Sequence, residues 1–253
     1  MTNSTPLYWT ASGGSLHTYA WMVKTLAGGR NQLPPKRGDD VAIPFLTGRR
    51  YSKKMMDSRT LPLDMWVEGK NPDGTIDSSM SKAAKLQNNW RYLMGLFRPT
   101  NGLQFNLTKR FYVGSDIMLA TAKAEMLDAP EPSASGADHW DFTVELFLAN
   151  PYFYSSVAAQ AIGTIDVQGD APTDRLRITM GNGRITSPDG NWIQYNGTGT
   201  VVIDTAAGTA KNGTQFVNGL VTRNPNFREL MRLQPGINAL TGSGTIEYKA
   251  AWE

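Results

Sequence analysis

Cysteine is absent from the 253-residue sequence, and histidine occurs only twice. The lack of cysteine excludes disulfide bonds, thiolate nucleophiles and cysteine-based metal sites, so stability has to come from packing. His17 and His139 are then the only imidazoles for proton transfer near neutral pH or for metal ligation. Neither stands in a recognisable motif. His139 has Asp138 and Asp141 nearby, but such a grouping beside a loop often occurs by chance, and we expect no metal site there.

Long apolar runs are also missing. The sequence has no stretch of about 18 apolar residues, the length that a membrane-spanning helix needs. The first residues, MTNSTPLYWT, lack the basic start and the apolar core of a signal peptide. We therefore expect a soluble protein that is made in a cytoplasm and does not insert into a membrane.

Motifs for catalysis and for cofactor binding are missing as well. The glycine-rich stretch GNGRITSPDG is not followed by a helix pattern, as a dinucleotide or phosphate loop requires. Asp166, Asp170 and Asp174 are four residues apart, which misses the alternate-residue spacing of a calcium loop. Asp39 and Asp40 would need a partner across a cleft for glycoside hydrolysis, and the sequence shows none. The sequence thus predicts no enzyme and no catalytic, cofactor or metal site.

What is present is the composition of a globular protein. Apolar residues make up 40% of the chain, charged residues 19% and aromatic residues 10%. Because 253 residues exceed the length of a typical single domain of about 100 to 150 residues, two domains are expected.

The positive charge is concentrated between residues 30 and 59. Aromatic residues for base stacking are scarce there, so a nucleic-acid site is the weakest interpretation. An exposed loop whose charges pair with neighbours, including a neighbouring subunit, is favoured over DNA binding. The segment has a net charge of +5, from eight basic residues against three acidic ones: Arg30, Lys36, Arg37, Arg49, Arg50, Lys53, Lys54 and Arg59 against Asp39, Asp40 and Asp57.

Periodic patterns in the first half predict strands around one helix. Apolar residues alternate with polar ones over 61–67, 103–107, 118–126 and 142–148, as in half-buried strands. Between Met80 and Phe97 the spacing changes to three and four, which is typical of a helix with one apolar stripe. Asp77, Ser78 or Ser79 is expected to cap its N-terminus. The stripe consists of Ala83, Leu86, Trp90, Leu93 and Phe97.

The second half has the pattern of an antiparallel β-sandwich. The dipeptide Asn150-Pro151 ends the last strand of the first half, and three aromatic residues follow it at 152–154. Beyond residue 163, short alternating runs are separated by turn signals about every ten residues. Trp192, Tyr195 and Trp252 could stack against sugars, although aromatic residues at alternating positions more often belong to a core or an interface.

Three segments together resemble a known family. They are the basic KRGDDVAIPFLTGRRYSKK leading into RTLPLDMWVEG, the aromatic FLANPYFYSS, and RLQPGINALTGSGTIEYKAAW near the C-terminus. In order and spacing the chain is similar to the distal tail proteins, also called Dit-like minor tail proteins, of bacteriophages with long non-contractile tails. The resemblance spans nearly the whole chain.

The resemblance implies a mainly β architecture in two domains. Residues 1–157 would form a ring-forming domain, a β-sandwich or split barrel with one helix at about 80–97. Residues 158–253 would form a galectin-like antiparallel β-sandwich, with a turn at PGIN, residues 235–238. Tyr152, Phe153 and Tyr154 are expected to seal the junction between the two domains.

The resemblance also implies a structural role in the virion. Six copies would form a ring at the distal end of the tail, joining the tail tube to the tip or baseplate hub. Its partners would be other copies of itself, the major tail tube protein, the tape measure protein and the tail-tip hub proteins. A host cell-wall glycan is a further possible ligand, so a carbohydrate- or receptor-binding module of the tail tip is the main alternative. A DNA-binding protein that uses residues 30–59 ranks last.

Overall fold

The computed structural model describes residues 8–24, 36–37, 41–42, 49–50, 55–98, 103–113, 115–134, 138–227 and 230–252. By its contacts the chain divides into two compact units, one that reaches to Phe153 and one over Tyr154–Trp252. The boundary expected from the sequence, between residues 157 and 158, lies four residues further along the chain.

The N-terminal unit contains α1, which is the only α-helix of the described residues. Its other elements are strands. In chain order the elements are β1 (Tyr8–Ala11), β2 (Gly14–Ser15), β3 (Trp21–Val23), β4 (Lys36–Arg37), β5 (Val41–Ala42), β6 (Arg49–Arg50), β7 (Met55–Met56), β8 (Arg59–Glu68), α1 (Lys82–Phe97), β9 (Gln104–Val113), β10 (Asp116–Met126), β11 (Ser133–Ala134) and β12 (His139–Leu148).

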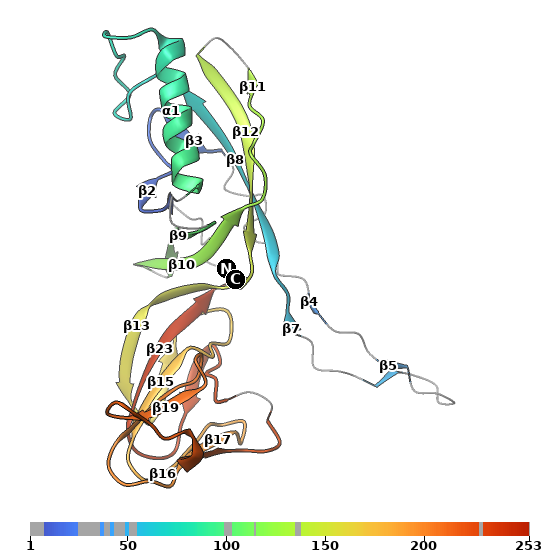
Figure 1. Cartoon of the computed structure of the whole chain (residues 1–253), viewed down its shortest axis with the longest axis vertical. Helices are drawn as coiled ribbons and strands as arrows, with labels where there is room; N and C mark the ends of the chain where they lie inside the picture. The colour runs from blue at the N-terminus through green and yellow to red at the C-terminus, as the bar shows by residue number, and fades with distance from the viewer. Residues whose placement is uncertain are drawn as a thin grey trace. The chain divides into compact units, whose positions relative to one another are not determined.

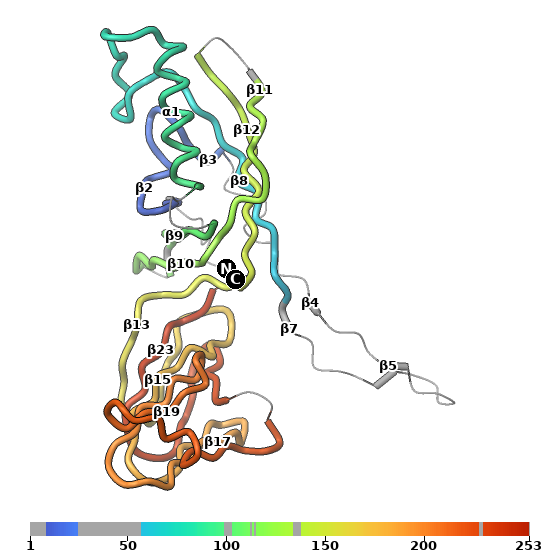
Figure 2. The backbone as a smooth tube through the Cα atoms, viewed as in Figure 1, coloured from blue at the N-terminus to red at the C-terminus, as the bar shows by residue number. Residues whose placement is uncertain are grey.

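The longest strands form where the sequence alternates. In β8, and in β12 from Phe142 onward, every second side chain is buried, and the two strands pair in register from His139↔Glu68 to Leu148↔Arg59. Figure 2 shows the two strands running side by side. Each buried Leu or Val side chain contributes about 1.5–3 kcal/mol relative to exposure. The alternation therefore fixes which face of the sheet becomes the core, as predicted.

Seven described strands form one antiparallel sheet in the order β2-β1-β9-β10-β12-β8-β3, and β11 also pairs with β12. Two halves of this sheet meet through the pairs Glu125↔Phe147 and Met126↔Leu146. Helix α1 packs on β8, as Figure 1 shows. It contacts both halves, because Phe97 meets Phe105 of β9 and Trp90 meets Trp140 of β12.

Helix α1 forms where the sequence predicts it, but its N-cap and two of its positions, Ala83 and Asn89, differ from the prediction. It begins at Lys82, and the N-cap is Ser81, whose hydroxyl accepts a hydrogen bond from the Ala84 N–H at 3.2 Å. The expectation that Asp77, Ser78 or Ser79 caps it was wrong, because Ser81 is the residue with extended backbone directly before the first turn. Ala83 is exposed, whereas the polar Asn89 is buried beside Leu86 and Leu93.

Part of the basic segment forms two short antiparallel pairs. Lys36 and Arg37 of β4 pair with Met56 and Met55 of β7. In the same way β5 pairs with β6, where Arg49 and Arg50 lie. Arg30, Asp39, Asp40, Lys53 and Lys54 lie outside the described residues.

The C-terminal unit is all β apart from one short 3-10 turn. Every strand pairing between its strands with a given register is antiparallel. Its elements are β13 (Phe153–Ala161), which begins at the last residue of the N-terminal unit, β14 (Thr164–Val167), β15 (Leu176–Met180), β16 (Gly183–Thr186), β17 (Trp192–Tyr195), β18 (Val201–Asp204), β19 (Thr209–Asn212), β20 (Gln215–Phe216), η1 (Asn218–Leu220), β21 (Val221–Arg223), β22 (Gly236–Ala239) and β23 (Thr245–Trp252).

These strands form a sandwich. One layer has the order β13-β23-β15-β18-β19-β20, and the others are β16-β17-β21 and β14-β22. Ile178 and Ile203 of the first layer and Ile185 and Ile193 of the second are buried. Because each layer has one apolar face, the layers pack face to face. The expected turn at PGIN is instead largely strand, since β22 begins at Gly236.

The mainly β architecture with one helix, predicted from the sequence, is confirmed.

Candidate functional site

His139 lies between two carboxylates at the start of β12. Its Nδ1 is 3.3 Å from Oε1 of Glu68 on β8, and its Nε2 is 3.0 Å from Oδ1 of Asp141. The indole of Trp66 stacks on the imidazole, with ring centroids 5.9 Å apart. Of the two acids near His139 in the sequence, the structure brings only Asp141 to its ring. Glu68 was not predicted, although strand pairing places it directly across from His139.

Lysines balance the carboxylates of this cluster. The Lys24 ammonium pairs with Asp141, and this hydrogen bond holds the pKa of the Asp141 carboxyl below its usual value. The Lys70 ammonium lies 2.5 Å from Oε2 of Glu68, which raises the pKa of Lys70. Within the described residues, no group of three or more His, Asp or Glu side chains is suited to hold a metal ion. The contacts of His139, Glu68 and Asp141 form a polar network that links β8 to β12.

The other sequence candidates are dispersed. His17 forms an isolated bridge with Met22, which in turn pairs with Trp66 of β8. Asp166 lies in β14, the Asp170 N–H donates to the Ala251 carbonyl at 3.2 Å, and the Asp174 carbonyl accepts from the Leu176 N–H at 3.1 Å. Asp39 and Asp40 lie outside the described residues. Asp166, Asp170 and Asp174, which the structure describes, thus lie in different local settings.

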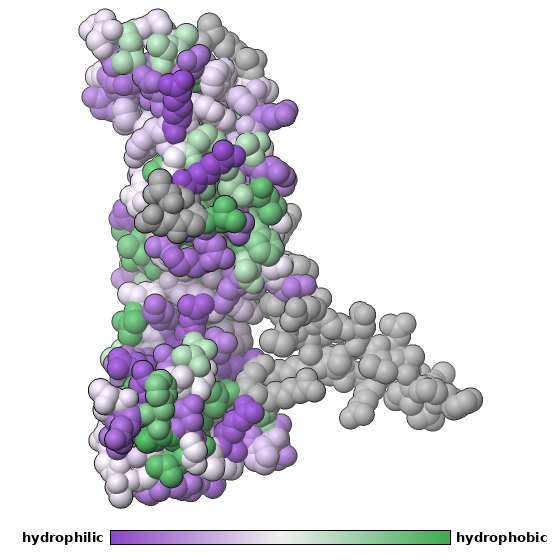
Figure 3. Space-filling model, viewed as in Figure 1, coloured by the Kyte–Doolittle hydropathy of each residue, from purple (hydrophilic) through white to green (hydrophobic). Residues whose placement is uncertain are grey.

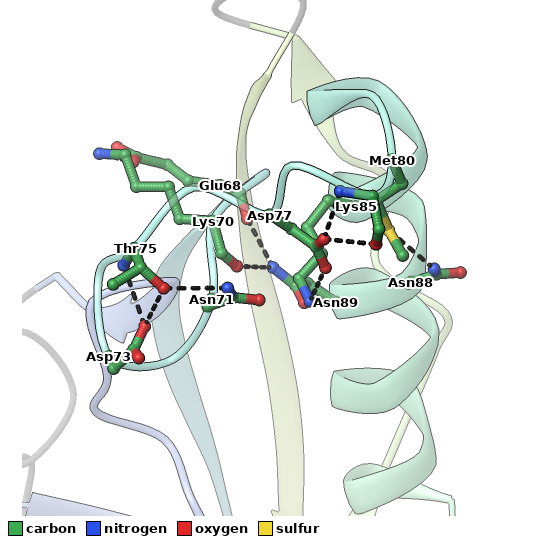
Figure 4. Close-up of polar contacts among 11 residues, drawn as sticks. Glu68, Lys70, Asn71, Asp73, Thr75, Asp77, Met80, Lys85, Asn88 and Asn89 are labelled. Atoms are coloured by element: carbon green, nitrogen blue, oxygen red, sulfur yellow. Dashed lines mark hydrogen bonds and ion pairs between the residues drawn. The ribbon is translucent and has the colours of Figure 1, made fainter.

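The loop before α1 is held by its own carboxylates, as Figure 4 shows. Oδ1 of Asp73 accepts from the Thr75 N–H at 2.9 Å and from the Thr75 hydroxyl at 2.7 Å. Oδ1 of Asp77 accepts from the Ser79 N–H at 2.9 Å, and the Lys85 ammonium donates to Oδ2 at 3.2 Å. These hydrogen bonds, first those from Thr75 and Ser79, lower the pKa of Asp73 and Asp77. Their effect is to order the turn that leads into α1.

Asn89 fastens α1 to the strand that it covers. Its Nδ2 donates to the Glu68 carbonyl at 2.7 Å and to the Lys70 carbonyl at 2.8 Å, as can be followed in Figure 4. The side chain is buried, so these two hydrogen bonds replace the hydrogen bonds to water that its amide group loses on folding. The end of β8, and with it Glu68, is thereby set against the helix.

The aromatic segment after Asn150-Pro151 is anchored residue by residue. Oδ1 of Asn150 accepts from the Tyr152 N–H at 3.1 Å, which closes a turn at the buried Pro151. Phe153 is fully buried in the N-terminal unit, edge-on to Trp9. The neighbouring Tyr154 is buried in the C-terminal unit.

One solved structure matches the chain over almost its whole length. It is the crystal structure of the Dit protein (gp 19.1) of phage SPP1, a paradigm of the hub adsorption apparatus in phages that infect Gram-positive bacteria. The match covers 97% of this chain and 99% of that chain, with a TM-score of 0.64 and 14% sequence identity. The chain has the Dit fold.

Other comparisons add less. Two structures of the phage P2 baseplate in its activated conformation, with Ca and with Sr, cover 87% of this chain and 88% of that chain at 7% identity. Their TM-scores of 0.38 and 0.37 are too low to establish a common fold. Comparisons with protein-family models and with curated proteins each gave no match.

In this Dit fold the aromatic residues considered for sugar stacking are mostly interior. Tyr195 is 1% exposed, and its hydroxyl donates to the Thr198 carbonyl at 3.0 Å. Trp252 is 7% exposed. Trp192 is half-buried, and the guanidinium of Arg184 lies over its ring, 4.2 Å from the centroid. The rings of Tyr195 and Trp252 are therefore covered, and Arg184 lies over one face of the Trp192 ring.

The described part of the Dit fold exposes several large apolar side chains. Ile117 and Leu119 of β10 are 45% and 57% exposed. They lie on the opposite face of the strand from Ala120, Ala122 and Ala124, which are buried. Figure 3 shows apolar surface among polar side chains in both units. No described helix is long and apolar enough to span a membrane. Exposed apolar side chains that gather into one contiguous patch are typical of protein–protein contacts.

Proposed function

We propose that the chain is a structural protein of a phage tail. Six copies form a ring at the distal end of the tail, and the ring joins the tail tube to the tip or baseplate hub. The observation that carries the proposal is the match to the SPP1 Dit protein over 97% of this chain and 99% of that one. Because both units take part in the match, the proposal concerns the whole chain.

The described surface supports a role in assembly. In a closed ring each subunit offers two different patches, one to each neighbour, and no reactive side chain is needed. The outward-facing Ile117 and Leu119 of β10 supply apolar surface of the kind that such contacts bury. The polar network around His139 links strands within one unit, which is a structural use of its charges.

The proposed partners follow from this position in the virion. They are further copies of the chain, the major tail tube protein, the tape measure protein and the proteins of the tail-tip hub. The basic segment of residues 30–59 pairs, in this proposal, with acidic surface on the next copy. Changing Arg49, Arg50, Lys53 and Lys54 to Ser would then weaken ring assembly, and a ring that forms normally would rule out that pairing.

The mass of the purified chain tests the ring directly. Light scattering coupled to size exclusion should give about six times 27.8 kDa, and negative-stain images should show annular particles. A monomer at all concentrations, and no ring in native particles, would contradict the proposal. The double variant Ile117→Lys, Leu119→Lys is expected to reduce assembly, and Phe216→Lys, an exposed position in the other unit, serves as its matched control.

A further inference from the structure

The outer face of the first layer of the C-terminal unit contains a charged pocket of about 330 Å³. This volume lies at the lower end of the range for small-ligand sites, about 300–1,000 Å³. Strands β13, β15, β18 and β23 contribute to it. Its lining residues are Val157, Arg175, Leu176, Arg177, Asp204, Ala206, Glu247, Tyr248 and Lys249.

Strand alternation brings the charged side chains of the pocket together. Arg177 lies directly across from Glu247 on one side and from Asp204 on the other. Leu176 and its partner Tyr248 are buried, so the residues before and after them point outward. The cross-strand pair of Leu176 and Tyr248 therefore forms the floor, and charged residues form the walls.

Both acidic side chains of the pocket have an ion-pair or hydrogen-bond partner within the described part of the protein, whereas two of its basic side chains do not. The guanidinium of Arg177 lies 3.4 Å from the carboxylate of Glu247, and Oδ1 of Asp204 accepts from the Ala207 N–H at 2.9 Å. Among the described residues, neither Arg175 nor Lys249 has an ion pair or a side-chain hydrogen bond.

Arg175 is nevertheless held in place. Its guanidinium lies over the ring of Tyr154, 4.1 Å from the centroid. Such stacking orders the guanidinium plane and leaves its N–H groups available at the edge. An ordered but unpaired arginine beside an unpaired lysine is a preformed site for an anion.

We propose that this pocket binds a phosphate monoester group. A phosphate monoester carries about 1.5 to 2 negative charges at pH 7, which matches the two unpaired cations, whereas a single carboxylate carries one. The planar Arg175 edge suits two phosphate oxygens, and Lys249 supplies a point charge. Val157 and Ala206 offer small apolar contacts to the group that carries the phosphate. The site goes beyond the proposed ring and does not depend on it.

Calorimetric titration of the intact chain at low ionic strength tests the site. The probes are glycerol 1-phosphate, inorganic phosphate, and glycerol as the neutral control. One saturable site per chain is expected for the phosphates and none for glycerol. Tighter binding of glycerol 1-phosphate than of inorganic phosphate would identify a phosphate ester as the ligand, and equal binding would identify free phosphate.

Variants locate the binding. Arg175→Met and Lys249→Met should each weaken it about tenfold or more, because each removes a charge-assisted contact. Asp204→Asn should tighten it, since it removes a repelling charge while its side-chain oxygen still accepts the Ala207 N–H. This gain cannot result from loss of structure. Lys211→Met, a cation over Phe216 elsewhere in the same unit, is the matched control and should bind as the unchanged chain does.

Four results would overturn the proposal. They are no saturable phosphate binding by the unchanged chain, unchanged affinity in both Arg175→Met and Lys249→Met, an equal loss in Lys211→Met, and tighter binding of a poly-glutamate peptide, which would point to an acidic protein partner instead. The oligomeric mass, measured on the same samples, shows separately whether the ring forms.

Discussion

Phe153 meets Trp9 edge-on, with 5.7 Å between the ring centroids and 63° between the planes. The Arg59 guanidinium and the Lys109 ammonium lie over the Phe153 ring, 5.6 and 4.7 Å from its centroid. The next residue, Tyr154, belongs to the other unit. Two consecutive aromatic side chains are thus buried in two different units, and each anchors its end of the connection between the units.

Replacing Phe153 by Ala should lower the free energy of unfolding of the N-terminal unit by about 3–5 kcal/mol, because it opens a cavity beside Trp9. Urea denaturation followed by tryptophan fluorescence measures the loss. Phe153→Leu is the control and should cost clearly less, since it keeps most of the buried volume. Equal losses in the two variants would show that packing volume at this position is not what matters.

Asn89→Leu should destabilise the N-terminal unit by about 2 kcal/mol or more. The change keeps the side-chain size but removes the donors to the Glu68 and Lys70 carbonyls. Asn88→Leu, at the adjacent exposed position, should change stability by less than about 0.5 kcal/mol. Chemical denaturation of both variants measures their free energies of unfolding and so tests this difference. If they behave alike, the buried amide does not fasten the helix.

Gly69→Ala should destabilise the protein by about 1–3 kcal/mol through overpacking. A Cβ on Gly69 would lie 2.1 Å from the carbonyl oxygen of Lys82, a backbone atom in the first turn of α1. The same substitution at Gly95, which has open space around it on the exposed side of α1, should stabilise by up to about 1 kcal/mol. Thermal unfolding should therefore shift in opposite directions for the two variants.

The ion pair of Lys24 and Asp141 should make stability fall in acid. Its hydrogen bond lowers the pKa of Asp141 in the folded chain below the unfolded value of about 3.9. The stabilisation is therefore present above that value and is lost as the pH falls through the folded pKa. Asp141→Asn should reduce the slope of stability against pH in this acidic range.

Lys24→Met provides the complementary test of that ion pair, because removing the lysine should reduce the same slope. Lys123→Met, at an exposed position of β10, should leave the slope unchanged. Denaturant midpoints measured between about pH 2 and pH 6 give the slopes. An undiminished slope in both Asp141→Asn and Lys24→Met would assign the acid sensitivity to other groups, such as Asp73 and Asp77, whose pKa values are also lowered.

Local periodicity was enough to predict the strands around Leu63 and Val144 and the helix that ends at Phe97. It was not enough to separate Ser81 from Ser79 as the cap, because several polar residues in a row are each chemically able to cap. It also left the role of Tyr195 open. An aromatic residue at an alternating position looks the same in a sequence whether its face is covered or open, and here the sandwich covers it.

The sequence alone determined the architecture of this protein. Periods of two and of three to four residues specify strand and helix through the geometry of the backbone, and the absence of cysteine leaves packing as the source of stability. Only the tertiary structure decided which distant residues meet: Glu68 with His139, Asn89 with Lys70, and Arg175 with Tyr154. Such pairs are set by strand register and helix docking, which depend on the whole core at once and leave no local signal.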